Sequence, residues 1–517
     1  MNDNRGGISP VPGEGEWEAF VRSCLPETPP DDVAQAVTPW RRAVRFVLWG
    51  LLLTSVTLNF WRLDVILPSV GLLLCLLGFR RLRRENGWLL ACWCITLLRT
   101  AYLTVQWFFN ATVWQLSDLP PLVAGGVQLL LPAATFLLAL CLGMGFAGIR
   151  RAAGFPGGFF SALWLPAWYA AVTVLALLQY RGLLMGLVLL VCYAAILRGL
   201  WRLSEQLEQA GYAVRPAVPR LSDKTVAALF AGAWLTVTAC GLAFFSSYPM
   251  QWSPWEQQPA PRTEAAREEL PAPRTEAARE ELLALGFPQQ VLDDLTPGEI
   301  EACRGATLVV ADVWECVAQD GLLEKAQPDS DPAAPKLTIT GVAVRLPGQR
   351  ERWQVFHHFC WTNGVFCGTE AVELVPAWQM IQEGWGEDGA VSGRLLYDDD
   401  GGQVYEAPYY FLGERSFSYR SVFFGQSDVR RLFAAFSMPN EGKRHRGYLT
   451  YRTKEMQDGF IFDSWFNYTH QNSLFQYPVV TAEHMRQVNR WSRAGVFVTV
   501  EDALQFYPNA DVVQPFS

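Results

Sequence analysis

Residues 87–109 read GWLLACWCITLLRTAYLTVQWFF, an apolar stretch with a single charged residue, Arg99, near its middle. A helix needs about 20 such residues to cross the hydrocarbon core of a bilayer, so this stretch predicts a membrane-spanning helix. Six further stretches in the first half of the chain have the same character. They are residues 44–61, 65–79, 121–147, 160–179, 182–200 and 225–247. The sequence therefore predicts an all-α membrane bundle of seven transmembrane helices over residues 44–247.

The second of these stretches is the weakest. Residues 65–79 cover only 15 positions and include Pro68, so the segment is either a short tilted span or a re-entrant segment. The basic residues favour a span. Without this crossing, the cluster that begins at Arg41 and the cluster that begins at Arg80 would lie on opposite sides of the membrane.

Basic residues flank the predicted spans mostly on one side. Fourteen lie on that side and two, Arg62 and Arg181, lie on the other. The fourteen are Arg41, Arg42, Arg45, Arg80, Arg81, Arg83, Arg84, Arg150, Arg151, Arg198, Arg202, Arg215, Arg220 and Lys224. Because cytoplasmic loops carry an excess of lysine and arginine, we expect this side to be cytoplasmic. The prediction is a multi-pass protein of the cell membrane with a cytoplasmic N-terminus and an extracytoplasmic C-terminal domain.

The two halves of the chain differ in charge and in pattern. Residues 1–247 carry 19 Lys and Arg against 13 Asp and Glu, whereas the remainder carries 23 against 37. From Thr307 onward, short runs rich in β-branched and aromatic residues alternate with turn sequences such as DDDGG at 398–402. This pattern predicts a soluble β-rich domain, a β-sandwich or an α+β fold, over residues 307–517. Two helices are expected within it, near 427–436 and 481–491.

Between the bundle and this domain, the segment PAPRTEAAREEL occurs twice without change, at 259–270 and 271–282. Each copy joins an extended Pro-Ala-Pro start to good helix formers, and we expect neither copy to contribute to a core. We interpret residues 248–283 as an aromatic interfacial segment followed by this spacer, which would tether the β-rich domain. Residues 284–306 predict a collar of short helices, and residues 1–43 a cytoplasmic leader with short amphipathic helices.

Motifs that would identify an enzyme are absent from the sequence. The P-loop, the GxSxG and HExxH motifs, paired CxxC motifs and the dinucleotide-binding glycine pattern do not occur. All five histidines fall in the β-rich domain. The adjacent His357 and His358 would point to opposite faces of a strand, which argues against a local metal site. We predict no catalytic residue, no metal ion, no cofactor and no nucleic-acid partner.

Arg99 is the most informative residue of the predicted bundle. A charge in the middle of a span is costly, and it marks either a functional site or a paired structural one. Together with Gln106 and Gln128, Arg99 defines a candidate intramembrane polar site. Two interpretations stay open, bonding to backbone carbonyls and polar side chains of the bundle, or lining a polar cavity. No Asp, Glu or His lies at the midplane of any span, which disfavours proton-coupled carriers and intramembrane proteases.

The β-rich domain contains two further candidates. Cys303, Cys316, Cys360 and Cys367 lie in a predicted oxidising location and allow up to two disulfides with three connectivities. The first pairing to consider is Cys360 with Cys367 across the TNG turn, and the alternative is that the cysteines are reduced and buried. The second candidate is an aromatic surface that would bind sugar or peptide, the alternative being that its residues pack in the core. It comprises Trp465, Phe466, Tyr468 and Tyr477.

Two classes of function follow from this organisation. The first is a sensor, binding or envelope-associated module, in which the extracytoplasmic domain binds a ligand and the bundle anchors it in the lipid bilayer. The second is a transporter or membrane-embedded enzyme whose active part is the bundle around Arg99.

Overall fold

A computed structural model gives the fold of the protein. It describes residues 39–56, 63–114, 120–155, 161–178, 182–209, 221–255, 272–319, 322–327, 330–331, 333–380, 384–421, 425–473, 476–488, 496–510 and 512–516. The chain divides into two compact units, the first comprising Met1–Trp107 and Leu116–Thr236, the second Phe108–Gln115 and Val237–Ser517. Most of the predicted leader, residues 1–43, lies outside the described residues.

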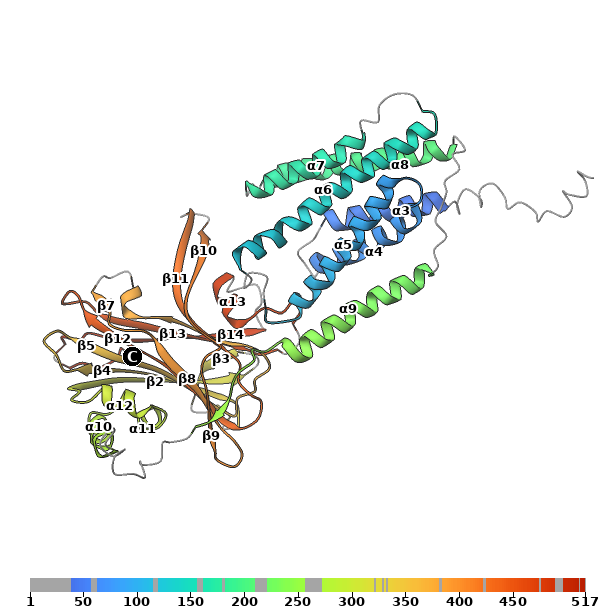
Figure 1. The fold of residues 1–517 in the computed structure, drawn as a ribbon. Helices are drawn as coiled ribbons and strands as arrows, with labels where there is room; N and C mark the ends of the chain where they lie inside the picture. The colour runs from blue at the N-terminus through green and yellow to red at the C-terminus, as the bar shows by residue number, and fades with distance from the viewer. Residues whose placement is uncertain are drawn as a thin grey trace, which may run out of the picture. The chain divides into compact units, whose positions relative to one another are not determined.

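Apolar helices form the first unit (Figure 1). They are α3 (Pro39–Ser55), α4 (Leu63–Leu82), α5 (Gly87–Asn110), α6 (Pro121–Ala152), α7 (Ser161–Leu177), α8 (Leu183–Gln209) and α9 (Asp223–Phe245), of which α5 and α9 end in the second unit. Within the described residues, five helices are long and apolar enough to cross a membrane. They are α4, α5, α9, Gly125–Ala152 of α6 and Leu184–Leu207 of α8. Since α3 and α7 have only 17 residues each, the structure does not show all seven spans that the sequence predicts.

The weakest predicted span is part of one continuous helix. α4 extends beyond residues 65–79 on both sides, with Asp64 in its first turn and Arg80 and Arg81 in its last turn. Its 20 residues are enough to cross a bilayer.

Small residues let α3 and α4 pack closely. A Cβ atom added to Gly50 would lie 2.6 Å from the carbonyl oxygen of Gly71, and one added to Gly71 would lie 2.8 Å from the carbonyl oxygen of Gly50. Helices surrounded by lipid gain little from burying apolar side chains against each other, so close backbone approach contributes much of their association.

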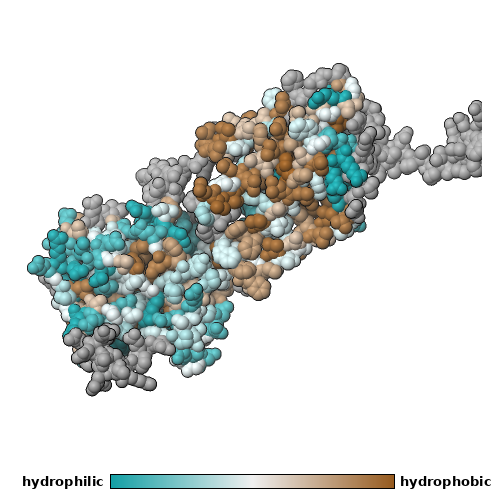
Figure 2. Space-filling view, in the orientation of Figure 1, coloured by the Kyte–Doolittle hydropathy of each residue, from teal (hydrophilic) through white to brown (hydrophobic). Residues whose placement is uncertain are grey.

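The surface of the first unit is largely apolar. Figure 2 shows hydrophobic residues over most of its visible face and hydrophilic residues gathered at one end. Large apolar side chains that are exposed include Trp49, Leu98, Trp164, Val191 and Leu229. Soluble proteins rarely expose apolar surface of this extent, so this surface and the five apolar helices support membrane association.

Two antiparallel sheets dominate the second unit. In the first sheet the strand order is β1 (Ser253–Pro254), β9 (Val404–Ala407), β8 (Ser392–Asp398), β12 (Lys443–Glu455), β5 (Arg352–Thr362), β4 (Lys336–Leu346), β2 (Leu308–Gln319) and β3 (Leu322–Lys325), with β7 (Trp385–Glu387) also paired to β12. In the second sheet it is β10 (Phe411–Ser421), β11 (Gly425–Phe436), β6 (Glu370–Val375), β13 (Phe462–Gln471) and β14 (Phe497–Phe506).

Side chains from both sheets meet in one core. Phe359 of β5 packs against Phe436 of β11 and Tyr468 of β13, with ring centroids 5.5 and 4.9 Å apart. All three rings are fully buried. These two antiparallel sheets confirm the prediction of a β-rich C-terminal region.

The prediction of a helix near 427–436 is wrong, because this segment lies in strand β11. β11 pairs with β10 on one side and, from Leu432 to Phe436, with β6 on the other. The apolar run LFAAF is buried on both faces of the sheet, so packing and pairing override the helix preference of its Leu and Ala residues. The helix expected near 481–491 is present as α13 (Ala482–Val488), and its last predicted residues lie outside the described part of the chain.

The described residues that precede and follow the repeat belong to the second unit. Before the repeat, β1 pairs with β9, and the Trp255 amide donates to the Val404 carbonyl at 2.8 Å. After it, the chain continues in helix α10 (Ala272–Ala284). Trp252 packs on Tyr397 of β8, and Trp255 lies under the guanidinium of Arg394. Both tryptophans of this predicted interfacial segment therefore contact the β-rich region.

The second copy of the repeat contributes to a core, contrary to the expectation from its composition. Ala278 and Leu282 of α10 are fully buried in a cluster with Phe287 and with Phe356 of β5. Arg279 donates to the Leu292 carbonyl at 3.2 Å. The first copy, residues 259–270, lies outside the described residues.

Short helices occupy the predicted collar. They are α11 (Gln289–Leu292) and α12 (Pro297–Ala302), and α12 begins with a capping box in which Thr296 and Glu299 bond each other's backbone amides. The collar packs on the first sheet through Ile300 and Leu292, which share a buried cluster with Val342 and Val344 of β4.

Candidate functional site

Arg99 belongs to the buried face of α5. The buried residues of this helix recur every three or four positions, which places them on one face. They are Leu89, Cys92, Thr96, Arg99, Leu103 and Trp107. The side chain of Arg99 is 93% buried, since its relative exposure is 7%. Within the described residues, its Nε and Nη1 atoms are buried without a hydrogen-bond partner.

Three hydroxyl groups from three other helices form a cluster in the same bundle. The Tyr169 hydroxyl of α7 lies 2.7 Å from Ser55 Oγ at the end of α3, and the Tyr193 hydroxyl of α8 lies 3.0 Å from the same Oγ. Tyr193 also donates to the Leu51 carbonyl at 2.8 Å, and the Trp168 ring stacks on it at 4.3 Å. These contacts fix the phenol rings in place inside the bundle.

Arg99 and this hydroxyl cluster both lie in the first unit. No acidic residue occurs in any of the seven apolar stretches of the sequence. Asp223, in the first turn of α9, is bonded to Arg80 and Arg81. The first unit thus contains a buried arginine with unpartnered nitrogen atoms and a cluster of hydrogen-bonded hydroxyl groups.

The three predicted polar residues have different outcomes. Arg99 lies on the buried face of α5, and Gln106 lies two turns further along the same helix, where it is half-buried. Gln128 is in helix α6, but its side chain lies outside the described residues. Sequence reasoning missed Ser55, Tyr169 and Tyr193, because a hydroxyl in an apolar stretch carries no sign of which helix it faces.

The predicted aromatic surface is divided between core and surface. Phe466 and Tyr468 are fully buried, with Phe466 stacked on His357 at 5.3 Å and the Tyr468 hydroxyl accepting from Trp361 Nε1 at 3.1 Å. Trp465 and Tyr477 are half-buried. Phe466 and Tyr468 therefore pack in the core, which was the alternative to a binding surface.

Cys360 and Cys367 are free thiols in the structure. Cys360 lies between the core residues Phe359 and Trp361, so its side chain points to the other face of β5, where Arg446 of β12 is its cross-strand partner. Cys367 Sγ donates to the Gln471 carbonyl of β13 at 3.0 Å. The two sulfur atoms therefore face different surroundings, although their positions in the sequence are close. Burial raises the pKa of the Cys360 thiol.

The adjacent histidines of β5 face opposite sides of the sheet, as predicted. His357 lies in the core, where its Nε2 is 2.8 Å from Ser464 Oγ, and burial lowers the pKa of His357 to about 3. The imidazole is therefore neutral near pH 7. His358 Nε2 lies 2.9 Å from Asp294 Oδ2 on the collar side.

Asp294 joins the collar to the first sheet. Its carboxylate accepts from His358 and from Arg446 Nε at 2.8 Å, and its carbonyl accepts from Arg394 at 2.7 Å. Burial opposes ionisation of Asp294, but the hydrogen bonds and charges of His358 and Arg446 outweigh it, so the pKa of Asp294 is lowered. Arg446 also bonds Asp398 at 2.6 Å. This buried network is structural, because every charged group in it has a partner.

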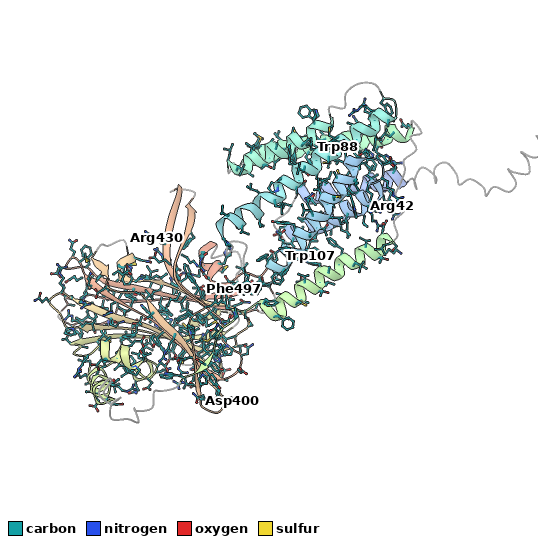
Figure 3. The ribbon with its side chains drawn as sticks, viewed as in Figure 1. Arg42, Trp88, Trp107, Asp400, Arg430 and Phe497 are labelled. Atoms are coloured by element: carbon teal, nitrogen blue, oxygen red, sulfur yellow. The ribbon has the colours of Figure 1, made fainter. Side chains whose placement is uncertain are left out.

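The ends of α5 and α9 are packed into the second unit. Val113, just after α5, donates its amide to the Phe245 carbonyl at the end of α9 at 2.9 Å. At Gly241 the two segments touch, since an added Cβ would lie 2.4 Å from the Cβ of Ala111. Val113 and Tyr248 share a buried cluster with Ala435 of β11. Figure 3 labels Trp107, the last residue of α5 in the first unit.

Comparison with family models and with curated proteins finds no match. Among solved structures, the chain is similar to one described as "Pore forming protein", at 7% identity over 40% of this chain and 94% of that one, with a TM-score of 0.17. It is also similar to the KRT10-binding region domain of the pneumococcal serine rich repeat protein PsrP, at 8% identity over 38% and 99%, with a TM-score of 0.14. TM-scores this low carry no argument about function.

Proposed function

We propose that the chain is a seven-span membrane protein in which an extracytoplasmic β-sandwich binds a ligand and passes the binding event to the bundle through α5 and α9. The observation that carries this proposal is the packing of these two helix ends within the second unit. A domain held only by a flexible linker would anchor a binding site without affecting the bundle. A domain packed on helix ends can bias their position.

A chain of contacts connects the end of α9 to the second sheet. The Tyr248 amide donates to Ser437 Oγ at 3.0 Å, and Ser437 Oγ donates to the Gly368 carbonyl at 2.7 Å. The Tyr248 ring stacks on Tyr410 with centroids 4.4 Å apart. On the α5 side, the Val479 amide donates to the Asn110 carbonyl at 2.7 Å. A change in strands β6, β10 or β11 would therefore act on both helices.

The arginine-rich helix ends support the proposed orientation. Arg42 at the start of α3 lies 3.6 Å from Asp223 at the start of α9, which also bonds Arg80 and Arg81 at the end of α4. Arg41 and Arg45 lie over the Trp201 ring near the end of α8. Basic residues of α3 and α4 thus gather with the start of α9 and with Trp201 of α8 at one end of the bundle, and the excess of positive charge favours the cytoplasmic side for that end.

Hydrogen–deuterium exchange on the full-length protein in lipid nanodiscs tests the coupling. Ser437→Ala removes the acceptor of the Tyr248 amide, and we expect faster exchange at residues 108–114 and 240–248 and in α5 near Arg99. The matched control is Thr499→Ala, which also removes a hydroxyl bond of the second sheet, 3.0 Å to Thr469, but on β14. Wild-type exchange at both helix ends in Ser437→Ala would contradict the proposal.

A second candidate function is transport or membrane-embedded catalysis around Arg99. The observation in its favour is the buried guanidinium with unpartnered nitrogen atoms. Arg99→Gln in proteoliposomes tests it. Loss of solute flux in a folded variant supports the candidate, and unchanged flux contradicts it.

A further inference from the structure

Strand β10 is an edge of the second sheet, and it is long and regular. It pairs with β11 in eleven consecutive residue pairs from Phe411 to Ser421, without a bulge, and it contains no proline. Proteins usually keep edge strands short, interrupt them or cover them, because a free edge pairs with other chains. Within the described residues, no backbone hydrogen bond joins β10 to an element other than β11. Its outer edge is therefore open to another strand.

The strands at the other ends of the two sheets are short or partly covered. In the first sheet, the end strands β1 and β3 have only two and four residues. In the second sheet, the Phe516 amide donates to the Gln505 carbonyl of β14 at 2.9 Å, so the C-terminal residues cover part of that edge. Among these four end strands, β10 is the one that combines length with an open edge.

The outer part of β10 belongs to a ribbon of two strands. β11 pairs with β6 only from Leu432 to Phe436, and its described residues before Leu432 pair with β10 alone. Figure 1 shows this ribbon projecting beyond the other strands of the second sheet. A ribbon of two strands is marginally stable in water, and a further strand on its edge stabilises it.

The charges of β10 select one register for pairing with a second copy. Residues directly opposite each other in an antiparallel pair have the same hydrogen-bonding state and lie on the same face. A strand therefore pairs with its own copy about a single residue. The charged residues of β10 are Glu414, Arg415 and Arg420. Within β10, only a centre at Phe417 places opposite charges across from each other, because Glu414 then lies opposite Arg420 of the second copy. By symmetry this pair occurs twice.

Glu414 is available for such a pair. Its side chain is 51% exposed, and its contacts are long, 3.9 Å to Arg430 Nη1 and 3.5 Å to Gln379 Nε2. Exposed ion pairs of this kind contribute little to stability. Arg415, by contrast, already donates from Nε to Glu483 at 2.7 Å. The acidic residue of β10 can therefore pair with an arginine of another chain.

We propose that two copies of the chain associate through β10, with the two strands antiparallel about Phe417 and with Glu414 of each copy opposite Arg420 of the other. The second sheets, of five strands each, then form one continuous sheet. The contact is isologous, so it closes as a dimer and leaves no β10 edge free. This inference goes beyond the proposed function, and it holds on either side of the membrane.

Charge reversal in the full-length protein tests this register. Single-molecule photobleaching in liposomes, at a series of protein-to-lipid ratios, gives the dissociation constant of the dimer. Glu414→Arg places arginines opposite each other and Arg420→Glu places carboxylates opposite each other, so each should raise the dissociation constant by about tenfold or more. The double variant restores opposite charges in the same register, and its dissociation constant should lie within about threefold of the wild type.

The matched control for the charge is Lys443→Glu. Lys443 belongs to β12 of the first sheet, and its side chain is 72% exposed. This substitution changes the net charge by the same amount as Arg420→Glu, and the dissociation constant should stay at the wild-type value.

Disulfide cross-linking tests the same register without changing a charge, and it decides the question if a charge variant does not fold. Phe417→Cys places two thiols across the symmetry axis, with Cβ atoms about 4.5–5.5 Å apart. The control is Thr499→Cys, at an exposed position of β14. We expect an oxidant to form a covalent dimer of Phe417→Cys, above the level that the native cysteines give in the wild type, and no such increase for Thr499→Cys.

Three results would overturn the proposal. The first is a wild type that stays monomeric at the highest protein-to-lipid ratio. The second is a dimer that neither charge reversal weakens, or equal cross-linking of the two cysteine variants. The third is a monomer that co-purifies with an extended peptide which protects the β10 amides from hydrogen exchange, and this result would assign the edge to a peptide ligand.

Discussion

Asp294→Asn is the substitution that most directly tests how the collar is held on the first sheet. Asp294 is 1% exposed, and its carboxylate accepts from Arg446 and His358 at 2.8 and 2.9 Å. The asparagine keeps the volume and removes the charge. Hydrogen bonds to charged groups contribute about 1.5–3 kcal/mol each, which gives about 3–6 kcal/mol for the two.

Arg446 would keep Asp398 as a partner at 2.6 Å, so its charge would not be left uncompensated. We therefore expect the lower end of this range, about 3 kcal/mol less stability of the second unit. The assay is urea unfolding of the full-length protein, followed by hydrogen exchange at β5 and β12. The control is Asp400→Asn, at a side chain that is 86% exposed and that Figure 3 labels. Equal losses in the two variants would refute the reasoning.

Three further predictions concern other parts of the chain. Burial and the negative charge of nearby Asp312 raise the pKa of Asp502 to about 6. The protonated carboxyl group therefore favours the folded state, and this contribution to stability is lost as the pH rises through about 6. Asp502→Asn should therefore stabilise the protein by about 3 kcal/mol at pH 8 and much less at pH 4, measured by urea unfolding. Gly50→Ala should lower the melting temperature in nanodiscs, because its Cβ would lie 2.5 Å from Cys75 Sγ, whereas Gly126→Ala on α6 has nothing within 4 Å and should not. Because the two copies are identical, deleting either one gives the same chain, in which one copy still precedes LALGFP. The free energy of unfolding, measured with urea, should therefore change by less than about 0.6 kcal/mol.

The sequence alone predicted the division into apolar helices and a β-rich region, because both depend on local composition and periodicity. It failed at β11, where the pairing partners β10 and β6 decide the conformation of a segment with helix-forming residues. It also failed at Ala278 and Leu282. Their burial depends on Phe287 and Phe356, which the twelve-residue repeat does not contain.

The candidate site was predictable only in part. Arg99 stands out because a charge in an apolar stretch is rare and costly. Ser55, Tyr169 and Tyr193 come from α3, α7 and α8, and only the packing of these helices brings their hydroxyl groups together. Likewise, the packing of α5 and α9 into the second unit depends on contacts such as Tyr248 with Ser437, which are far apart in the sequence.

The orientation of the chain is the central claim, and reporter fusions test it most directly. A reporter active only in the cytoplasm is fused after Arg84, after Arg151 and after Ser517, and each fusion is paired with a reporter active only outside. We expect cytoplasmic signals at the first two positions and an extracytoplasmic signal at the third. A cytoplasmic signal after Ser517 would contradict this orientation and would place the β-rich region inside the cell.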